Sequence, residues 1–165
     1  MSPNKVPRWA APGPPPGYPE LPPGCRWAAA GLLGQAVVVH YIVDGMNVIG
    51  TRPDGWWRDR PAARRRLVEQ VAPLAGDLGE VTVVFDGRST TDETDRASDI
   101  GVRVAFAPGG PNAADDAIVE MVGSLDDPED TVVVTSDRGL VDRVRRLGVK
   151  VESARTFLSR LEPSA

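Results

Sequence analysis

The chain has 165 residues and a formal net charge of −4, which suits one domain with a sizeable hydrophobic core. The acidic balance argues against a protein that coats nucleic acid through its overall charge, although local arginine clusters can still meet phosphates. Cys25 is the only cysteine and His40 the only histidine. A disulfide framework, a cysteine-based zinc site and a histidine-rich metal site are therefore excluded.

The first 36 residues are dominated by proline, glycine and alanine. Such a segment buries too little apolar surface to order itself, so we expect residues 1–36 to be a disordered tail and residues 37–165 to form the domain. The apolar stretch 27–43 is interrupted by Gln35 and His40. It also falls short of the roughly 20 residues of a spanning helix. We expect neither a membrane segment nor a secretory signal, and a cytoplasmic protein.

Three apolar, β-branched runs each end on an aspartate. They cover residues 37–44, 81–86 and 131–137, and they end at Asp44, Asp86 and Asp137. Runs this apolar predict strands that are buried on both faces, as in a parallel sheet. Shorter strands are predicted over residues 102–106 and 149–151.

Helices are predicted between these strands. One begins at the cap Asp59 and runs to about Ala75, and another follows a predicted cap at Asn112. The last two cover about residues 138–147 and 156–161, whereas the polar segment 86–99 is predicted to be a mobile loop. Alternating strands and helices predict an α/β fold with a largely parallel sheet.

Oxygen-bearing side chains follow these strands or begin a helix. They are Asp44, Asn47, Asp86, Asp115, Asp116 and Asp137. In a parallel sheet they point to one edge, where α/β proteins bind ligands. Clustered carboxylates repel one another, and an all-oxygen set suits Mg²⁺ or Mn²⁺. A structural interpretation also stays open, because aspartates often cap helices and Asp137 can cap the helix after it.

Four segments carry a family resemblance. They are Asp44-Gly45-Met46-Asn47-Val48-Ile49, Phe85-Asp86-Gly87, Ala114-Asp115-Asp116 and Thr135-Ser136-Asp137-Arg138. In this order and spacing they resemble the NYN family of PIN-like ribonucleases, specifically its YacP-like branch, over about residues 41–161. Two positions depart from the family pattern. Met46 stands where many relatives carry an aromatic residue, and Asp116 stands where a glutamate is common.

The resemblance implies a metal-dependent endoribonuclease with a three-layer, Rossmann-like fold. Its mostly parallel sheet would have about five strands in the order 3-2-1-4-5. It assigns metal binding and catalysis to Asp44, Asp115 and Asp137. It assigns supporting roles to four further residues, namely Asn47, Asp86, Asp116 and Ser136. The implied cofactor is Mg²⁺ or Mn²⁺, and the implied partner is RNA, with a possible association with ribosomes or the RNA-processing machinery.

Basic and aromatic residues near this edge suggest contacts with RNA. Arg52, Arg88 and Arg138 can hold phosphates, although each can also be a solvated surface residue. The pair Trp56-Trp57 can stack an unpaired base or cover the helix and sheet. His40 is expected inside the sheet rather than as a catalytic base.

Other interpretations start from the same pattern. A noncatalytic RNA-binding module with the same fold stays open, because Asp116 is short and the net charge is acidic. A phosphorylation receiver domain would want an acidic pair directly after the first strand, where Asp44 is followed by Gly45. A P-loop nucleotidase is excluded, because the chain has no Gly-x-x-x-x-Gly-Lys segment.

Overall fold

The computed structural model describes residues 39–89 and 91–162. In chain order the elements are β1 (Val39–Asp44), α1 (Gly45–Gly50), η2 (Trp56–Arg58), α2 (Arg60–Leu78), β2 (Gly79–Asp86), α3 (Thr91–Asp99), β3 (Arg103–Ala107), α4 (Ala113–Gly123), η3 (Pro128–Asp130), β4 (Thr131–Val134), α5 (Arg138–Arg145), β5 (Lys150–Glu152) and α6 (Ala154–Leu161), where η marks 3₁₀ turns. The predicted tail 1–36 and the predicted strand residues 37 and 38 lie outside the described residues. Among the described helices, none has the length and apolar character needed to cross a bilayer.

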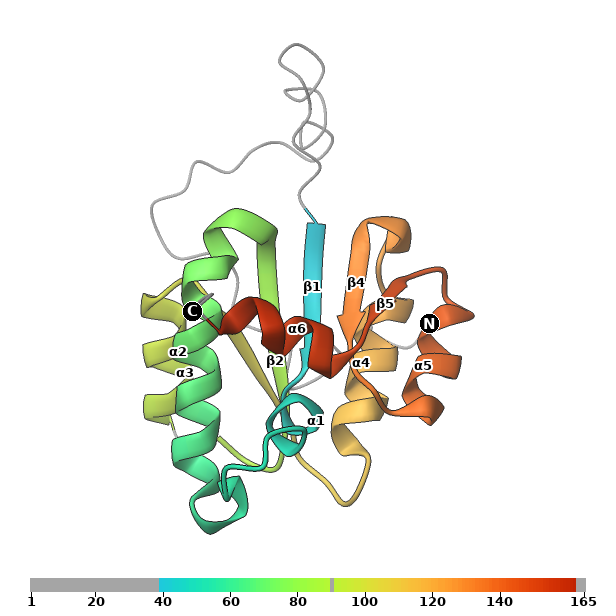
Figure 1. The fold of residues 1–165 in the computed structure, drawn as a ribbon. Coiled ribbons are helices and arrows are strands. Elements are labelled where there is room, and N and C mark those ends of the chain that lie inside the picture. The colour runs from blue at the N-terminus through green and yellow to red at the C-terminus, as the bar shows by residue number, and fades with distance from the viewer. Residues whose placement is uncertain (1–38, 90, 163–165) are drawn as a thin grey trace, which may run out of the picture. The chain divides into compact units, whose positions relative to one another are not determined.

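The sheet has five parallel strands in the order β3-β2-β1-β4-β5. This confirms the predicted α/β class and the predicted strand order. Val43 of β1 is in register with Val83 of β2 and Val134 of β4, so the carboxyl ends of the central strands are level. In Figure 1, β1 runs to the edge of the sheet at which α1 begins.

Helices cover both faces of the sheet, which gives three layers. Val43 packs in one buried cluster with Leu67 of α2 and Phe157 of α6, and α6 crosses that face in Figure 1. The neighbouring Ile42 packs in a second cluster with residues of α4 and α5, such as Ile118. Successive strand residues face opposite sides, so the uninterrupted apolar runs bury both faces of the sheet.

The segment predicted to be a loop, 86–99, contains a helix, α3 (Thr91–Asp99). That prediction was wrong. The segment has no apolar stripe of helical period, but Ala97 is 1% exposed and packs in the same cluster as the α2 residues. Among the side chains of this helix whose burial is described, 95–99, Ala97 is therefore the tertiary anchor.

The other boundaries moved by a few residues. Asp59 caps α2 as predicted, because its carboxylate accepts the N–H of Ala62 at 3.0 Å, but the helix continues past Ala75 to Leu78. The last helix begins at Ala154 rather than 156, because the Ser153 hydroxyl accepts the N–H of Thr156 at 3.1 Å.

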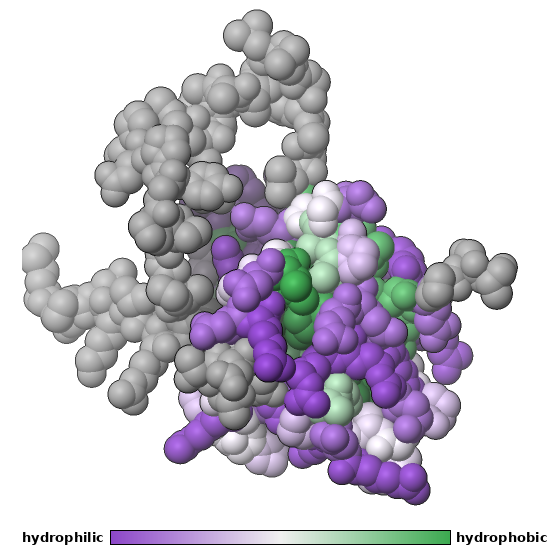
Figure 2. Space-filling view, turned by 90° about the vertical axis from the view of Figure 1, so that its left-hand side faces the viewer, coloured by the Kyte–Doolittle hydropathy of each residue, from purple (hydrophilic) through white to green (hydrophobic). Residues whose placement is uncertain are grey.

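The side of the domain that carries α2 and α3 is largely hydrophilic, with a narrow apolar strip (Figure 2). On α2, Arg65 and Glu69 are exposed, whereas Leu67 and Val71 are buried. This helix is therefore amphipathic and stays in place through one buried stripe.

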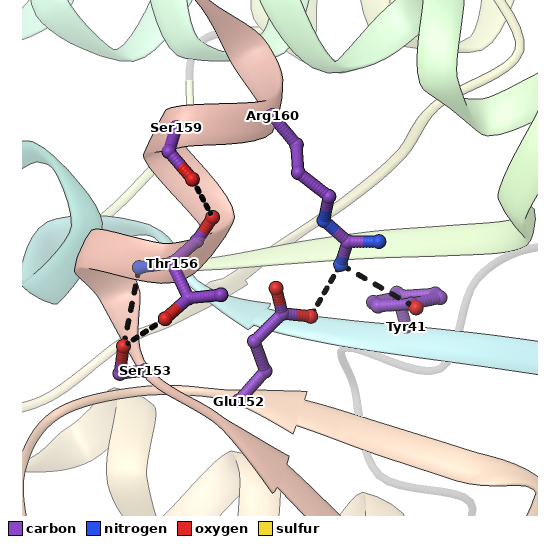
Figure 3. A network of polar contacts seen from close by, with 6 residues as sticks. All are labelled: Tyr41, Glu152, Ser153, Thr156, Ser159 and Arg160. Carbon is purple, nitrogen blue, oxygen red and sulfur yellow. Dashed lines mark hydrogen bonds and ion pairs between the residues drawn. The ribbon is translucent and has the colours of Figure 1, made fainter.

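Arg160 fastens α6 to the sheet (Figure 3). Its guanidinium donates to the carboxylate of Glu152 on β5 and to the hydroxyl of Tyr41 on β1. It also lies 5.4 Å from the ring centroid of Tyr41 and 5.7 Å from that of Phe157. A planar cation close to two rings adds cation–π attraction to the ion pair.

We predict that Arg160→Ala lowers the free energy of unfolding by about 1 kcal/mol. The expected loss is small because the side chain of Arg160 is 36% exposed and solvent screens its ion pair. Urea unfolding measures the change, with Arg155→Ala as the control, since Arg155 is exposed on the same helix. Equal losses in both variants would contradict a specific anchoring role for Arg160.

Candidate active site

The carboxyl edge of the sheet carries the acidic side chains that the sequence placed there. Asp44 ends β1 and Asp86 ends β2. Asp137 lies between β4 and α5, and Asp115 lies in the first turn of α4, which follows β3. Because the strands are parallel, these four positions share one edge, at which α1 begins in Figure 1.

Asp44 is buried, with 5% of its surface exposed. One carboxylate oxygen accepts the N–H of Asn47 at 3.3 Å and caps α1. The other oxygen accepts the hydroxyl of Thr135 at 3.1 Å. These bonds fix the carboxylate where β1 and β4 lie side by side.

Gly45 lets the chain turn into α1 directly after Asp44. A side-chain carbon at Gly45 would lie 2.3 Å from Cε1 of Phe85 and 3.0 Å from Cγ1 of Val83. Since Phe85 is 1% exposed, its ring has no free space to enter. Only glycine therefore fits at this junction without a shift of the core.

The loop of residues 135–137 is held from three sides. The side-chain oxygen of Asn47 accepts the N–H of Ser136 at 2.8 Å. The hydroxyl of Thr135 accepts the N–H of Asp137 at 3.1 Å, and the hydroxyl of Ser136 accepts the N–H of Ala154 at 3.0 Å. The loop that carries Asp137 is therefore held by α1, by α6 and by a hydrogen bond of its own.

Sequence reasoning missed Thr135 as a site residue. Its hydroxyl is the link between Asp44 and the backbone of Asp137. The available signal was a hydroxyl residue at the end of a buried strand, directly before Ser136 and Asp137. That signal did not name a partner, because Asp44 is 91 residues away in the chain.

Asp137 caps α5, as the structural interpretation of this residue expected. Its Oδ1 accepts the N–H of Leu140 at 2.9 Å. The side chain is exposed. Asp137 therefore adds a carboxylate to the solvent side of the edge.

The predicted cap of α4 was wrong. Asn112 adopts a left-handed conformation with φ of 68° and makes no side-chain cap bond. The carboxylate of Asp86 takes this role instead, because it accepts the N–H of Ala114 at 2.8 Å. The end of β2 thereby anchors the start of α4, and with it the neighbouring Asp115.

The carboxylates act on one another electrostatically. Burial raises the pKa of Asp44 from 3.8 to about 6, and the charges of Asp115 and Asp86 contribute to that rise. Burial also raises the pKa of Asp115, with further contributions from Asp137 and Asp86 that Arg143 partly offsets. This edge of the sheet therefore carries negative charge that its own neighbours do not neutralise.

Asp116 faces a different neighbour. It is exposed, and its carboxylate pairs with Arg143 of α5 at 2.8 Å. The pair joins α4 to α5 next to Asp115. A supporting role for Asp116 stays a prediction.

The predicted phosphate-binding arginines differ in exposure. Arg88 follows β2, Arg138 begins α5, and both are exposed. Arg52 is half-buried, and its Nε and Nη2 atoms have no hydrogen-bond partner among the described residues. Burial lowers the pKa of the Arg52 guanidinium, against the opposing charges of Asp54 and Glu162. Arg88 and Arg138 are therefore the better placed to meet a phosphate from solvent.

The edge fits a hard divalent cation in donor type and charge. Its side chains offer carboxylate, amide and hydroxyl oxygens, which Mg²⁺ and Mn²⁺ prefer. His40 lies four residues before Asp44 in β1 and bonds the hydroxyl of Thr82 at 3.0 Å. Within residues 39–89 and 91–162, no three acidic, histidine or cysteine side chains form a ready-made metal-binding group. A cation would nevertheless relieve the mutual repulsion of Asp44 and Asp115.

Comparison with known proteins identifies the family. The sequence matches the YacP-like NYN domain over residues 41–165. Two crystal structures of Rae1 (YacP) from Bacillus subtilis are similar in fold and 25% identical in sequence. One of them, a tryptophan-to-leucine mutant of Rae1, aligns with a TM-score of 0.60 over 74% of each chain. The other structure aligns with a TM-score of 0.57 over 73% of this chain and 72% of Rae1.

The comparison with curated protein sequences returned no match. The family match nevertheless spans β1 to α6 and includes the acidic residues of the carboxyl edge. The order of the strands agrees with the same assignment. The chain belongs to the YacP-like NYN domain family.

Proposed function

We propose that this PIN-like domain is a metal-dependent endoribonuclease that hydrolyses RNA phosphodiester bonds at the carboxyl edge of its sheet. The observation that carries the proposal is the buried carboxylate of Asp44, which faces the charges of Asp115 and Asp86. Burying a carboxylate among other carboxylates destabilises the fold, so such clusters are typical of functional sites. Family membership and the likeness to Rae1 support the same class of activity.

In this proposal Asp44, Asp115 and Asp137 hold Mg²⁺ or Mn²⁺. When bound, such an ion supplies Lewis-acid stabilisation of a phosphate oxygen and lowers the pKa of water. Asp44 offers a carboxylate that β1 and Thr135 hold in place. The cap that Asp86 forms on α4 holds Asp115 at the edge.

Four further residues support the site in this proposal. They are Asn47, Asp86, Asp116 and Ser136. Asn47 and Ser136 keep the loop before α5 against α1 through a 2.8 Å hydrogen bond. Rigid placement of the acidic groups matters, because phosphoryl chemistry depends on positioning.

Binding of RNA to an acidic edge requires cationic groups around it. We propose that Arg88 and Arg138, which are exposed, hold phosphates beside the cleaved bond. Arg52 can contribute only after a change of side-chain conformation, since part of its guanidinium is buried. We also propose that the protein acts in the cytoplasm and meets its RNA on ribosomes or with the RNA-processing machinery.

We predict that Asp115→Asn lowers RNA cleavage by about 100-fold, because the edge loses one of its proposed metal-binding carboxylates. The substrate is a labelled RNA hairpin with long single-stranded flanks, incubated with Mn²⁺, and the products are resolved on a gel. Asp126→Asn is the matched control, since Asp126 is an exposed aspartate after the far end of α4.

Equal cleavage by both variants would contradict the proposal and point to a contaminating nuclease. RNA binding without cleavage in the wild-type chain, unaffected by metal, would instead favour the noncatalytic RNA-binding module.

A further inference from the structure

Trp57 is left open to solvent. It is 59% exposed, more than any other large hydrophobic side chain in the described part of the chain. Tryptophan carries a large apolar surface that folding normally buries. Because most of the indole stays in water, Trp57 contributes little to the stability of the fold. An exposed tryptophan instead suggests a binding role.

The indole of Trp57 has a defined support. It packs edge-on against Trp56, with ring centroids 6.1 Å apart and an interplanar angle of 84°. Trp56 itself packs against the buried cluster on the α2 side. The turn is fixed as well, because Asp54 accepts the N–H of Trp56 at 3.2 Å and pairs with Arg66 of α2 at 3.1 Å.

This aromatic pair lies beside the acidic edge. A side-chain carbon at Gly50, the last residue of α1, would lie 3.9 Å from the Trp56 ring. α1 begins directly after Asp44 and has six residues, which is about 9 Å of helix. The teal segment that follows α1 in Figure 1 lies at the same edge of the molecule as α1.

Two exposed arginines follow the aromatic pair in the chain. Arg58 directly follows Trp57 and is exposed. The Arg60 guanidinium lies 5.8 Å from the ring centroid of Trp56 and is also exposed. Cations next to an open aromatic face are the arrangement that binds single-stranded nucleic acid, since bases stack and phosphates pair. Duplex RNA cannot use it in this way, because its bases are already paired and stacked.

We propose that Trp57 stacks an unpaired base of the RNA substrate, with Trp56 as its support and Arg58 and Arg60 on the adjoining phosphates. The site thereby selects single-stranded over duplex RNA. Trp57 thereby holds the strand on the side of α1 that contacts Trp56. The inference rests on the proposed function of the same edge.

The test measures RNA affinity in the full chain that carries Asp44→Asn, so that cleavage does not interfere. Fluorescence anisotropy gives the Kd for a short labelled single-stranded RNA and for a duplex of the same sequence. Trp57→Ala is expected to raise the Kd for the single strand about 5- to 100-fold and to leave the duplex Kd unchanged. Trp57→Phe keeps a stacking ring and is expected to restore most of the affinity.

Leu147→Ala is the matched control, because Leu147 is another exposed apolar residue, at 36%, and lies after α5. It is expected to change neither Kd, and Trp57→Ala is expected to keep the urea midpoint of its parent. The proposal is overturned if Trp57→Ala binds the single strand as its parent does, or if it loses single strand and duplex equally. A failure of the nuclease proposal would look different. The wild-type chain would then not cleave RNA, while its binding of single-stranded RNA would still depend on Trp57.

Discussion

Asp44→Asn is expected to abolish RNA cleavage while making the folded protein more stable at neutral pH. Asparagine keeps the size of the side chain but removes the charge that the proposed cation needs, so we expect cleavage to fall about 100-fold or more. The amide oxygen can still accept the N–H of Asn47, and the amide NH2 can donate to the Thr135 hydroxyl, so both contacts can be kept with the second one reversed in direction. A loss of activity in Asp44→Asn would therefore result from the missing carboxylate charge rather than from a disordered site.

The gain in stability follows from the raised pKa of Asp44. The folded state binds this proton with a pKa of about 6, against the ordinary value of 3.8. Above about pH 6 the folded protein holds a buried carboxylate, which lowers its stability by about 3 kcal/mol. As the pH falls from about 6 to about 4, the folded state takes up the proton before the unfolded state does, and that loss disappears.

Asp44→Asn should therefore exceed the wild type by about 2–3 kcal/mol in urea unfolding at about pH 7.5, and the difference should shrink at about pH 4.5. The buffers contain a chelator, so that metal binding does not stabilise the wild type. Asp126→Asn, at an exposed position, should show no such pH-dependent gain. A variant less stable than the wild type at both pH values, or one that still cleaves RNA, would refute this account of Asp44.

The sequence was sufficient to predict the parallel sheet and the edge of that sheet at which the acidic residues lie. Uninterrupted apolar runs predicted buried parallel strands, and parallel strands necessarily deliver their final residues to one edge. Asp44, Asp86, Asp115 and Asp137 therefore lie where the pattern predicted. The strand order came from the family resemblance, and the structure confirms it.

The hydrogen-bond partners at that edge could not be predicted in the same way. The bond between Asp86 and the start of α4 spans 28 residues, and the bond between Asp44 and Thr135 spans 91. Such contacts depend on how closely the elements pack, which local patterns do not encode. α3 was missed for a related reason, because it is anchored by the buried Ala97 rather than by a periodic apolar stripe.

Gly45→Ala is expected to destabilise the protein by about 2–4 kcal/mol, although alanine favours helices over glycine by about 1 kcal/mol. The added carbon would lie 2.3 Å and 2.5 Å from two ring atoms of Phe85. That ring is 1% exposed, and its centroid lies 5.6 Å from the ring centroid of Phe106. Either the ring or the junction of β1 and α1 has to move, and a moved junction displaces Asp44.

Gly76→Ala is the matched control for this prediction. Gly76 also lies in a helix, α2, but a side-chain carbon there meets no atom within 4 Å. Helix propensity then acts alone, and we expect a gain of about 0.5–1 kcal/mol in urea unfolding.

A second variant separates steric conflict from any other role of Gly45. Phe85→Leu removes ring atoms, so Gly45→Ala should lose much less stability in that background than in the wild type. Losses that simply add would show that the ring of Phe85 is not the obstacle. A much smaller loss in the Phe85→Leu background would show that glycine is required after Asp44 because the buried ring of Phe85 on β2 fills the space in which the chain turns. Packing of the core would then be a condition for placing the acidic edge.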